Sequence, residues 1–379
     1  MDIFGAIGAI NALLLALFLF KEKSKTTSDK ILIVWVLNFF LYFGCYFLYE
    51  RLTNDMSIIW LPIWGISLIS HSVFLFFYAL SLSKKSFVFD LRIASNFLLV
   101  ILWLVSMVPF MLMTPDEQHK LLYDKQSLNF EIFLPMMAQI CVELFYFIRA
   151  LIVLIQHQNN IDQEFSYHEK INLDWLKILT YLYIVILVSN VVGYTLVSSK
   201  NLNVKVMDDL LMIVRFLLFF YMIYHGYKQR LIYRTESKNN QRKTNKSLKA
   251  KTESSNAEHA QISVSKHNEI IEKLRILMVD EKLYLEPELS LGETANKIGF
   301  HAHQLSKLLN VQLGKNFFDF VNEYRVDEFK KLAINPKNKH ISLLGLAMDA
   351  GFNSKATFNR FFKKSTGITP SEFRERYKF

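Results

Sequence analysis

The stretch SLGETANKIGFHAHQLSKLLN, residues 290–310, has the pattern of two short helices joined by a tight turn. Ser290 and Glu293 have the spacing of a capping box, in which side chains and backbone N–H groups bond reciprocally at a helix start. Ala295 is small enough to let a second helix approach closely, and Gly299 permits the turn. The shared apolar seam consists of Ile298, Leu305 and Leu308. These residues predict a helix-turn-helix unit.

The same arrangement returns 52 residues later, in HISLLGLAMDAGFNSKATFNRFF at residues 340–362. The corresponding positions are Ser290 and Ser342, Leu291 and Leu343, Ala295 and Ala347, and Gly299 and Gly351. Phe358 follows its glycine by seven residues and Leu305 follows its own by six, so the second turn is one residue longer. A repeated unit at a fixed spacing predicts a pair of recognition helices.

Between the two units, NFFDFVNEYRVDEFKKLAI at residues 316–334 has apolar residues at near-helical spacing. We expect one connecting helix here. A rigid helix between two helix-turn-helix units would hold both recognition helices against successive major grooves on one face of a DNA duplex.

Residues 265–379 resemble the DNA-binding domain of the AraC/XylS family of bacterial transcription regulators. The segments that carry the resemblance are LSLGETANKIGFHAHQLSKLLN, GKNFFDFVNEYRVDEFKKL and GFNSKATFNRFFKKSTGITPSEFRERY. The last of these is close to the family signature, and Thr369, Pro370 and Glu372 are also a physically sound helix start. The resemblance covers less than a third of the chain. It implies two helix-turn-helix motifs, double-stranded DNA as partner and regulation of transcription.

Side chains predicted to contact DNA follow from position on the two recognition helices. On the first they are His303, Gln304, Ser306 and Lys307, and on the second they are Lys355, Thr357, Asn359 and Arg360, followed by Lys363 and Lys364 as phosphate contacts. Arg and Lys suit guanine, whereas Asn and Gln suit adenine. Arg360 is the strongest candidate for a base contact, and for the others a phosphate contact or plain exposure is equally consistent. His301 is a weak N-cap for the first of these helices.

The N-terminal half has a different composition. Seven apolar segments are each long enough to cross a bilayer as a helix. They are approximately Ile3–Phe20, Ile31–Tyr49, Ile58–Leu80, Ile93–Met113, Ile132–Ile155, Trp175–Val197 and Leu210–Tyr227. The whole chain is 52% hydrophobic with only 12 Gly and 7 Pro, which favours long helices. The expected fold class is therefore all-α, with a seven-helix transmembrane bundle at residues 1–227 and a soluble domain at 265–379.

Basic residues in the short loops predict the orientation of this bundle. Lys21, Lys23, Lys25 and Lys30 follow the first segment, Lys84, Lys85 and Arg92 follow the third, and the tail after the seventh is dense with Lys and Arg. Such loops stay in the cytoplasm, so we expect a multi-pass protein of the inner membrane with its N-terminus outside and its C-terminal domain inside. No basic stretch precedes the first segment, and we therefore expect a retained span and not a cleaved signal peptide.

Ionisable residues within membrane segments are costly, which makes each of them a candidate site. Gln139 and Glu143 share a face of the fifth segment, and Asp208 and Arg215 share a face near the seventh. A pair of Glu143 with Arg215 would form a buried polar centre that binds a ligand or switches the bundle. A structural ion pair or hydrogen bonds between helices are the alternative. The weaker candidates Asn38, His71 and Asn190 are explained by hydrogen bonds between helices.

The remaining features limit the classes of function. Residues 228–264 are basic and polar, as in a linker, and could also touch anionic lipid. The two cysteines, Cys45 and Cys141, lie in apolar runs without metal-ligand spacing, and no catalytic motif is present, so we expect no enzyme activity, metal or cofactor.

A signal transducer is the favoured hypothesis, in which the bundle senses a small-molecule or membrane signal and the tethered domain regulates promoters. RNA polymerase is a candidate partner. The alternatives are a transporter or membrane receptor with an accessory DNA-binding tail, and a regulator released by proteolysis. The signal, the target promoters and the oligomeric state are not indicated by the sequence.

Overall fold

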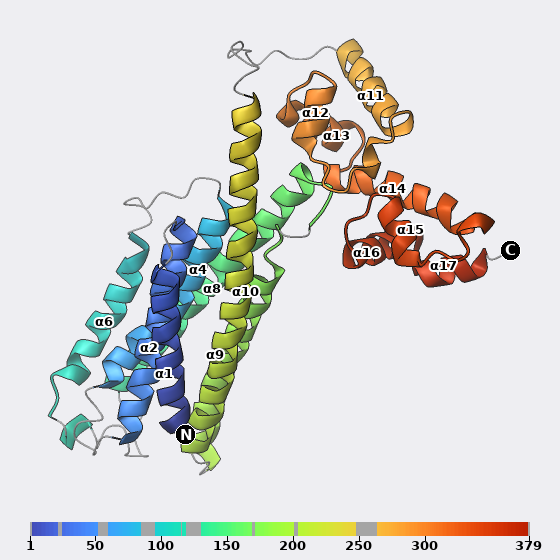
Figure 1. Ribbon diagram of the computed structural model, residues 1–379. Coiled ribbons are helices and arrows are strands. Elements are labelled where there is room, and N and C mark those ends of the chain that lie inside the picture. Colours follow the sequence, from blue (N-terminus) through green and yellow to red (C-terminus); the bar gives the residue numbers. More distant parts are fainter. Residues whose placement is uncertain are drawn as a thin grey trace. The chain divides into compact units, whose positions relative to one another are not determined.

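The protein was analysed as a computed structural model that describes residues 2–21, 25–51, 60–84, 95–114, 116–118, 130–168, 171–200, 204–247 and 264–377 (Figure 1). Within these ranges the chain is helical and forms no named strand, which confirms the predicted all-α class. Two compact units are present. The bundle unit comprises Met1–Ile155 and Leu173–Lys238, and the C-terminal unit comprises Gln156–Asn172 and Asn239–Phe379.

The bundle unit contains long helices that lie alongside one another (Figure 1). They are α1 (Asp2–Lys21), α2 (Thr27–Arg51), α4 (Trp60–Ser83), α6 (Leu98–Met111), α8 (Phe130–Glu164), α9 (Asp174–Lys200) and α10 (Val204–Ser247). A short turn, η1 (Ser95–Phe97), precedes α6. One continuous core of buried apolar side chains joins these helices, and much of it is aromatic. Phe39, for example, packs against the rings of Phe43, His71 and Phe219.

Five helices of the described residues are long and apolar enough to cross a membrane. They contain Ile3–Lys21, Thr27–Tyr49, Pro62–Ser83, Phe133–Glu164 and Asp174–Gly193. The fourth predicted segment lies on α6, whose 14 residues make it a shorter apolar helix. The seventh lies on α10, which is not among the five and carries Asp208, Asp209 and Arg215. Within the described residues, five of the seven predicted spans therefore correspond to helices of sufficient length and apolarity, and the number seven stays a prediction.

The predicted linker begins as a helix. We expected irregular chain from Lys228, but α10 continues to Ser247. Residues 228–247 contain neither Gly nor Pro and are rich in Lys, Arg and Gln, which are good helix formers. An existing helix is extended at low cost because its nucleation is complete. The rest of the predicted linker, residues 248–263, lies outside the described residues.

The C-terminal unit contains two helical lobes joined by one helix. The first lobe is built from α11 (Val264–Val279), the turn η2 (Leu283–Leu285), α12 (Leu291–Lys297) and α13 (Ala302–Gln312). The second is built from the turn η3 (Pro336–Asn338), α15 (Leu343–Asp349), α16 (Lys355–Thr366) and α17 (Pro370–Arg376). The joining helix is α14 (Phe317–Ile334), as the spacing in 316–334 predicts.

Opposite faces of α14 serve the two lobes. Phe317 and Val321 are buried in the core of the first lobe, whereas Phe318, Val326 and Phe329 are buried in the core of the second. Both lobes therefore depend on the orientation of a single helix.

Capping side chains hold the helix starts, as predicted. Ser290 with Glu293 and Thr369 with Glu372 form complete capping boxes, and Ser342 accepts a hydrogen bond from the Gly345 N–H. Hydrogen bonds from the Thr369 backbone and side chain hold the pKa of Glu372 below its usual range. His301 makes no capping bond at the start of α13, which agrees with its weak capping tendency.

The two corresponding glycines of the helix-turn-helix units differ in their surroundings. Gly299 and Gly351 both have positive φ, of 71° and 94°. A Cβ on Gly299 would meet no heavy atom within 4 Å, whereas one on Gly351 would lie 2.4 Å from the carbonyl oxygen of Tyr284. The second turn therefore needs glycine for space as well as for conformation.

Gly299→Ala should lower the free energy of unfolding of the C-terminal unit by about 1 kcal/mol, the cost of a left-handed backbone at a residue with a Cβ. Gly351→Ala should cost about 1 to 3 kcal/mol more, because the added methyl group overpacks the turn. Hydrogen exchange at increasing urea concentration measures both values in the full chain. Equal losses for the two variants would contradict the packing difference.

Candidate nucleic-acid interface

The first predicted recognition helix is α13. Its inner face is closed by Leu305, Leu308 and Leu309, which are buried. The predicted contact residues lie on the rest of the helix: His303 and Lys307 are exposed, and Gln304 and Ser306 are half-buried. All four therefore have some access to solvent, as a contact with DNA would require.

The second predicted recognition helix is α16, and here one expectation is wrong. Lys355, Asn359 and Arg360 are exposed, but Thr357 is only 5% exposed. Thr357 lies one helical turn before the buried Phe361 and so shares its inward face. Its N–H also donates to Ser354 Oγ, a cap that the sequence analysis did not identify. Thr357 is therefore a core residue, and its side chain is not presented on the outer face.

The two predicted phosphate contacts follow on the last turn of α16. Lys363 and Lys364 are both exposed. Lys364 Nζ lies 3.1 Å from Asp319 Oδ1, in an ion pair with α14. Because exposed pairs of this kind are weak, Lys364 can still turn toward a phosphate.

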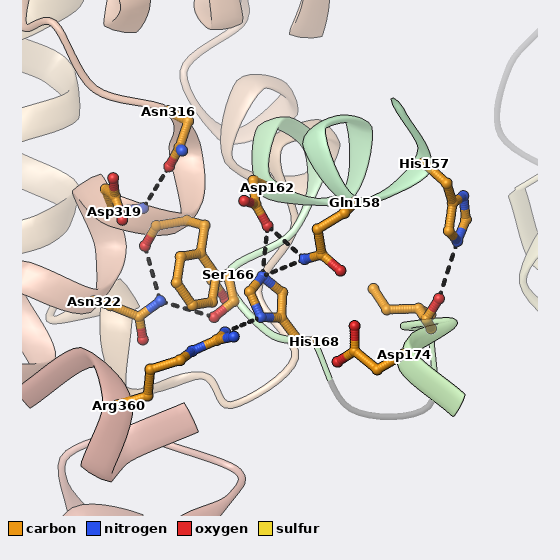
Figure 2. Close-up of polar contacts among 12 residues, drawn as sticks. His157, Gln158, Asp162, Ser166, His168, Asp174, Asn316, Asp319, Asn322 and Arg360 are labelled. Carbon is orange, nitrogen blue, oxygen red and sulfur yellow. Dashed lines mark hydrogen bonds and ion pairs between the residues drawn. The ribbon is translucent and has the colours of Figure 1, made fainter. Parts of the chain in front are cut away.

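Arg360 contacts residues that lie far away in the sequence. Its Nη2 donates to Nδ1 of His168 over 2.6 Å, and His168 Nε2 lies 2.6 Å from Asp162 Oδ1 (Figure 2). His168 and Asp162 belong to the Gln156–Asn172 part of the C-terminal unit. The sequence contains no motif that marks them, and the contact was not predicted.

Arg325 of α14 makes several hydrogen bonds in the interior of the C-terminal unit, with 1% of its surface exposed. Its guanidinium donates to the carbonyl oxygens of Tyr284 at 2.8 Å, Glu286 at 2.6 Å and Ser166 at 3.0 Å. Burial lowers the pKa of Arg325 to about 9, so it is still charged at neutral pH. This one cation joins α14, the chain before α12 and the 156–172 region.

The polar residues predicted for the bundle unit come together in part. Gln139 Nε2 donates to Glu143 Oε1 at 2.9 Å on α8. Arg215 Nη1 donates to Tyr42 Oη at 3.0 Å, and the charge of Arg215 also acts on Glu143. The charge of Asp208 also acts on Tyr42. Tyr42 is thus a partner of Arg215 that the sequence did not indicate, and the pairing of Glu143 with Arg215 stays a prediction.

A second polar group lies beside it. Nε1 of the buried Trp35 donates to His71 Nδ1 at 3.1 Å, and Asn38 Nδ2 donates to the Ser67 carbonyl at 2.9 Å. The rings of His71 and Tyr183 stack at 6.1 Å. Asn190 bonds only within its own helix among the contacts described, to the Ile186 carbonyl. Among the described residues, no cluster of three His, Cys, Asp or Glu side chains could hold a metal ion.

Comparison with known proteins identifies the C-terminal unit. Residues 294–376 match the family model of a helix-turn-helix domain. The Proteus vulgaris protein named "Probable transcription factor PqrA" is 31% identical over 97 residues, which cover 26% of this chain and 77% of that protein. An uncharacterised helix-turn-helix transcriptional regulator of Staphylococcus aureus is 34% identical over 93 residues, 24% of this chain.

This chain covers very different shares of the two relatives. The chain spans 12% of the length of the Staphylococcus aureus regulator. Among solved structures, a protein of unknown function from Listeria innocua matches 29% of this chain and 98% of its own, with 29% identity and a TM-score of 0.26.

Arg325→Met should lower the free energy of unfolding of the C-terminal unit by about 3 to 5 kcal/mol, because buried carbonyl oxygens lose their donor. Lys330→Met is the matched control on the same helix. It removes a partly exposed pair with Asp327 and should change stability by no more than about 0.5 kcal/mol. Urea-dependent hydrogen exchange of α14 measures both, and an Arg325→Met loss as small as the control's would rule out the role assigned to the guanidinium.

Proposed function

The chain belongs to the AraC-type helix-turn-helix family of transcription regulators, and on this premise we propose that it is a membrane-tethered regulator that binds DNA in a sequence-specific manner. The observation that carries the proposal is the pair of lobes on α14, each with a capped helix before an exposed recognition helix. In this proposal, a signal received by the bundle unit controls how the C-terminal unit binds promoters.

Exposed apolar side chains support membrane insertion of the bundle unit. Leu14, Leu17 and Phe20 of α1 are 60%, 59% and 65% exposed, and α6 and α9 also expose many large apolar residues. Such surfaces are rare on soluble proteins but match hydrocarbon. Lipid is therefore a proposed partner of this unit.

Chain order supports the proposed orientation. Gln156–Asn172 and Asn239–Phe379 belong to one unit, and α9 and α10 separate them in the sequence. Two crossings return a chain to the side from which it started. The loop after α8 and the C-terminal lobes would then share the cytoplasmic side, in agreement with the distribution of Lys and Arg.

The buried polar residues of the bundle unit support a role in sensing. His71 Nε2 and Tyr183 Oη are buried, and neither has a hydrogen-bond partner among the described residues. Unsatisfied buried polar atoms carry a cost that a ligand or a rearrangement of the bundle could remove. We propose that these atoms, together with Gln139, Glu143 and Arg215, form the signal-receiving centre.

Arg360→Ala should reduce the preference for a target duplex over a random one by roughly 5-fold to 150-fold, the value of one bidentate base contact. Lys363→Ala should weaken binding to both duplexes alike and lower the salt dependence by about one counterion, because it contacts phosphate. Both are measured by fluorescence anisotropy with the full chain in lipid nanodiscs, using a target duplex selected from a random pool. Unchanged discrimination in Arg360→Ala would contradict its assignment.

Glu143→Gln should change the transcriptional response while leaving the affinity for a target duplex within about twofold, because the substitution removes a charge that binding does not use. Cys141→Ser, an exposed position on the same helix, is the control and should respond like the wild type. RNA sequencing of cells that carry each variant gives the response. A wild-type response in Glu143→Gln would leave this carboxylate with a structural role only.

A further inference from the structure

We propose that the segment of residues 156–172 and DNA compete for the recognition helix α16, so that the segment inhibits DNA binding while it is docked. The 156–172 segment comprises the last turns of α8 and the chain that follows, and it is part of the C-terminal unit. The inference rests on the proposed function. In it, the regulator of DNA binding is the 156–172 segment of the same chain.

The first observation is how the segment binds Arg360. The Asp162 carboxylate accepts a hydrogen bond from His168 Nε2, which leaves the lone pair of His168 Nδ1 to accept from Arg360 (Figure 2). Gln158 Nε2 also donates to Asp162 and fixes the carboxylate. The guanidinium is thereby held by the imidazole. An arginine that reads guanine presents two of its guanidinium nitrogens to the base edge, and here Nη2 is bonded to the imidazole instead, so the His168 contact competes with the base contact.

The second observation is that His168 is packed in place and is only 5% exposed. Its ring stacks on Phe318 with centroids 4.0 Å apart and an angle of 6° between planes. Phe318 in turn contacts Phe361 of α16 edge to face. The imidazole therefore lies at the junction of α14 and α16 and holds Arg360 from a packed position.

The third observation is the anchoring of Ser166, which is fully buried. Its N–H and Oγ both donate to the Leu289 carbonyl, at 3.1 and 2.8 Å. Its own carbonyl accepts from Asn322 at 3.1 Å and from Arg325 at 3.0 Å (Figure 2 shows Ser166 and Asn322). The segment thus supplies the acceptor for two buried donors of α14, Asn322 and Arg325. Buried donors paired in this way are typical of a specific packed contact.

The segment also has a small core of its own. Ile161, Tyr167 and Ile171 are buried together, with Phe165 packed against them. His157 bonds the Ile171 carbonyl across the turn. Its shape is therefore held independently of the Arg360 contact, as a preformed inhibitor requires.

A route for release follows from the continuity of α8. The same helix carries Gln139 and Glu143 in its first half and Gln158 and Asp162 in its last turns. A signal that shifts or frays the end of α8 would displace Asp162 and free the imidazole, and with it Arg360. In this mechanism the inhibited state is the one that the structure describes.

His168→Ala removes both the acceptor for Arg360 and the stack on Phe318. In the full chain in nanodiscs it should tighten binding to the selected target duplex by about tenfold, because a larger fraction of molecules is competent to bind. His168→Phe keeps a ring on Phe318 but loses the acceptor, and it should show a smaller gain. Gln163→Ala, at an exposed position of the same segment, is the matched control and should bind as the wild type does.

Hydrogen exchange provides a second test that needs no substitution. The Ser166 N–H is bonded in the docked segment, so saturating target duplex should speed exchange in the peptide that contains it, while a random duplex at equal concentration should not. Unchanged or weaker DNA binding by His168→Ala, together with unchanged Ser166 exchange on DNA addition, would overturn the competition. If the wild type binds target and random duplexes equally, the proposed function fails first, and the inference fails with it.

Discussion

A single buried cation organises the C-terminal unit. The guanidinium of Arg325 bonds three carbonyl groups from two separate stretches of chain, and it carries almost no exposed surface. A buried charge is tolerated only where its donors are well matched, so the surrounding backbone has to be held in one arrangement. Gly351 belongs to that arrangement, because a side chain at this position would press on both the Tyr284 carbonyl and Arg325 Nε. The Arg325 guanidinium therefore fixes both the turn at Gly351 in the second lobe and the chain at Tyr284 in the first.

The pattern of residues predicted the C-terminal lobes well because their determinants are local. Capping boxes, turn glycines and helical spacing of Phe and Leu operate within a few residues, and α12 to α17 follow them. Thr357 was placed wrongly because the exposed face of α16 depends on where Ser354 starts the helix. The partners of Arg360 and Arg325 could not be predicted, since His168 and Ser166 are more than 150 residues away and no local signal marks them.

The difference between local and long-range determinants also explains which features of the bundle unit could be predicted. Length and hydropathy indicated its helices, whereas the polar partners across helices follow only from packing. Tyr42 bonds Arg215, and Trp35 bonds His71, yet aromatic residues are so frequent here that neither stands out in the sequence. Because Arg215 is one of few cations in the apolar part of α10, its position is set by what neutralises or solvates it.

Because both faces of α14 are packed, this helix sets the orientation of the two lobes relative to each other. The angle between the two lobes is set by the phase between Phe317 and Val321 on one side and Phe318 and Phe329 on the other. One residue inserted into α14 would rotate the second lobe by about 100° relative to the first, so the two recognition helices would no longer face the same side of a duplex. In the proposed function, a change of target sequence would therefore come from the outer faces of α13 and α16, while α14 keeps the spacing between these two helices.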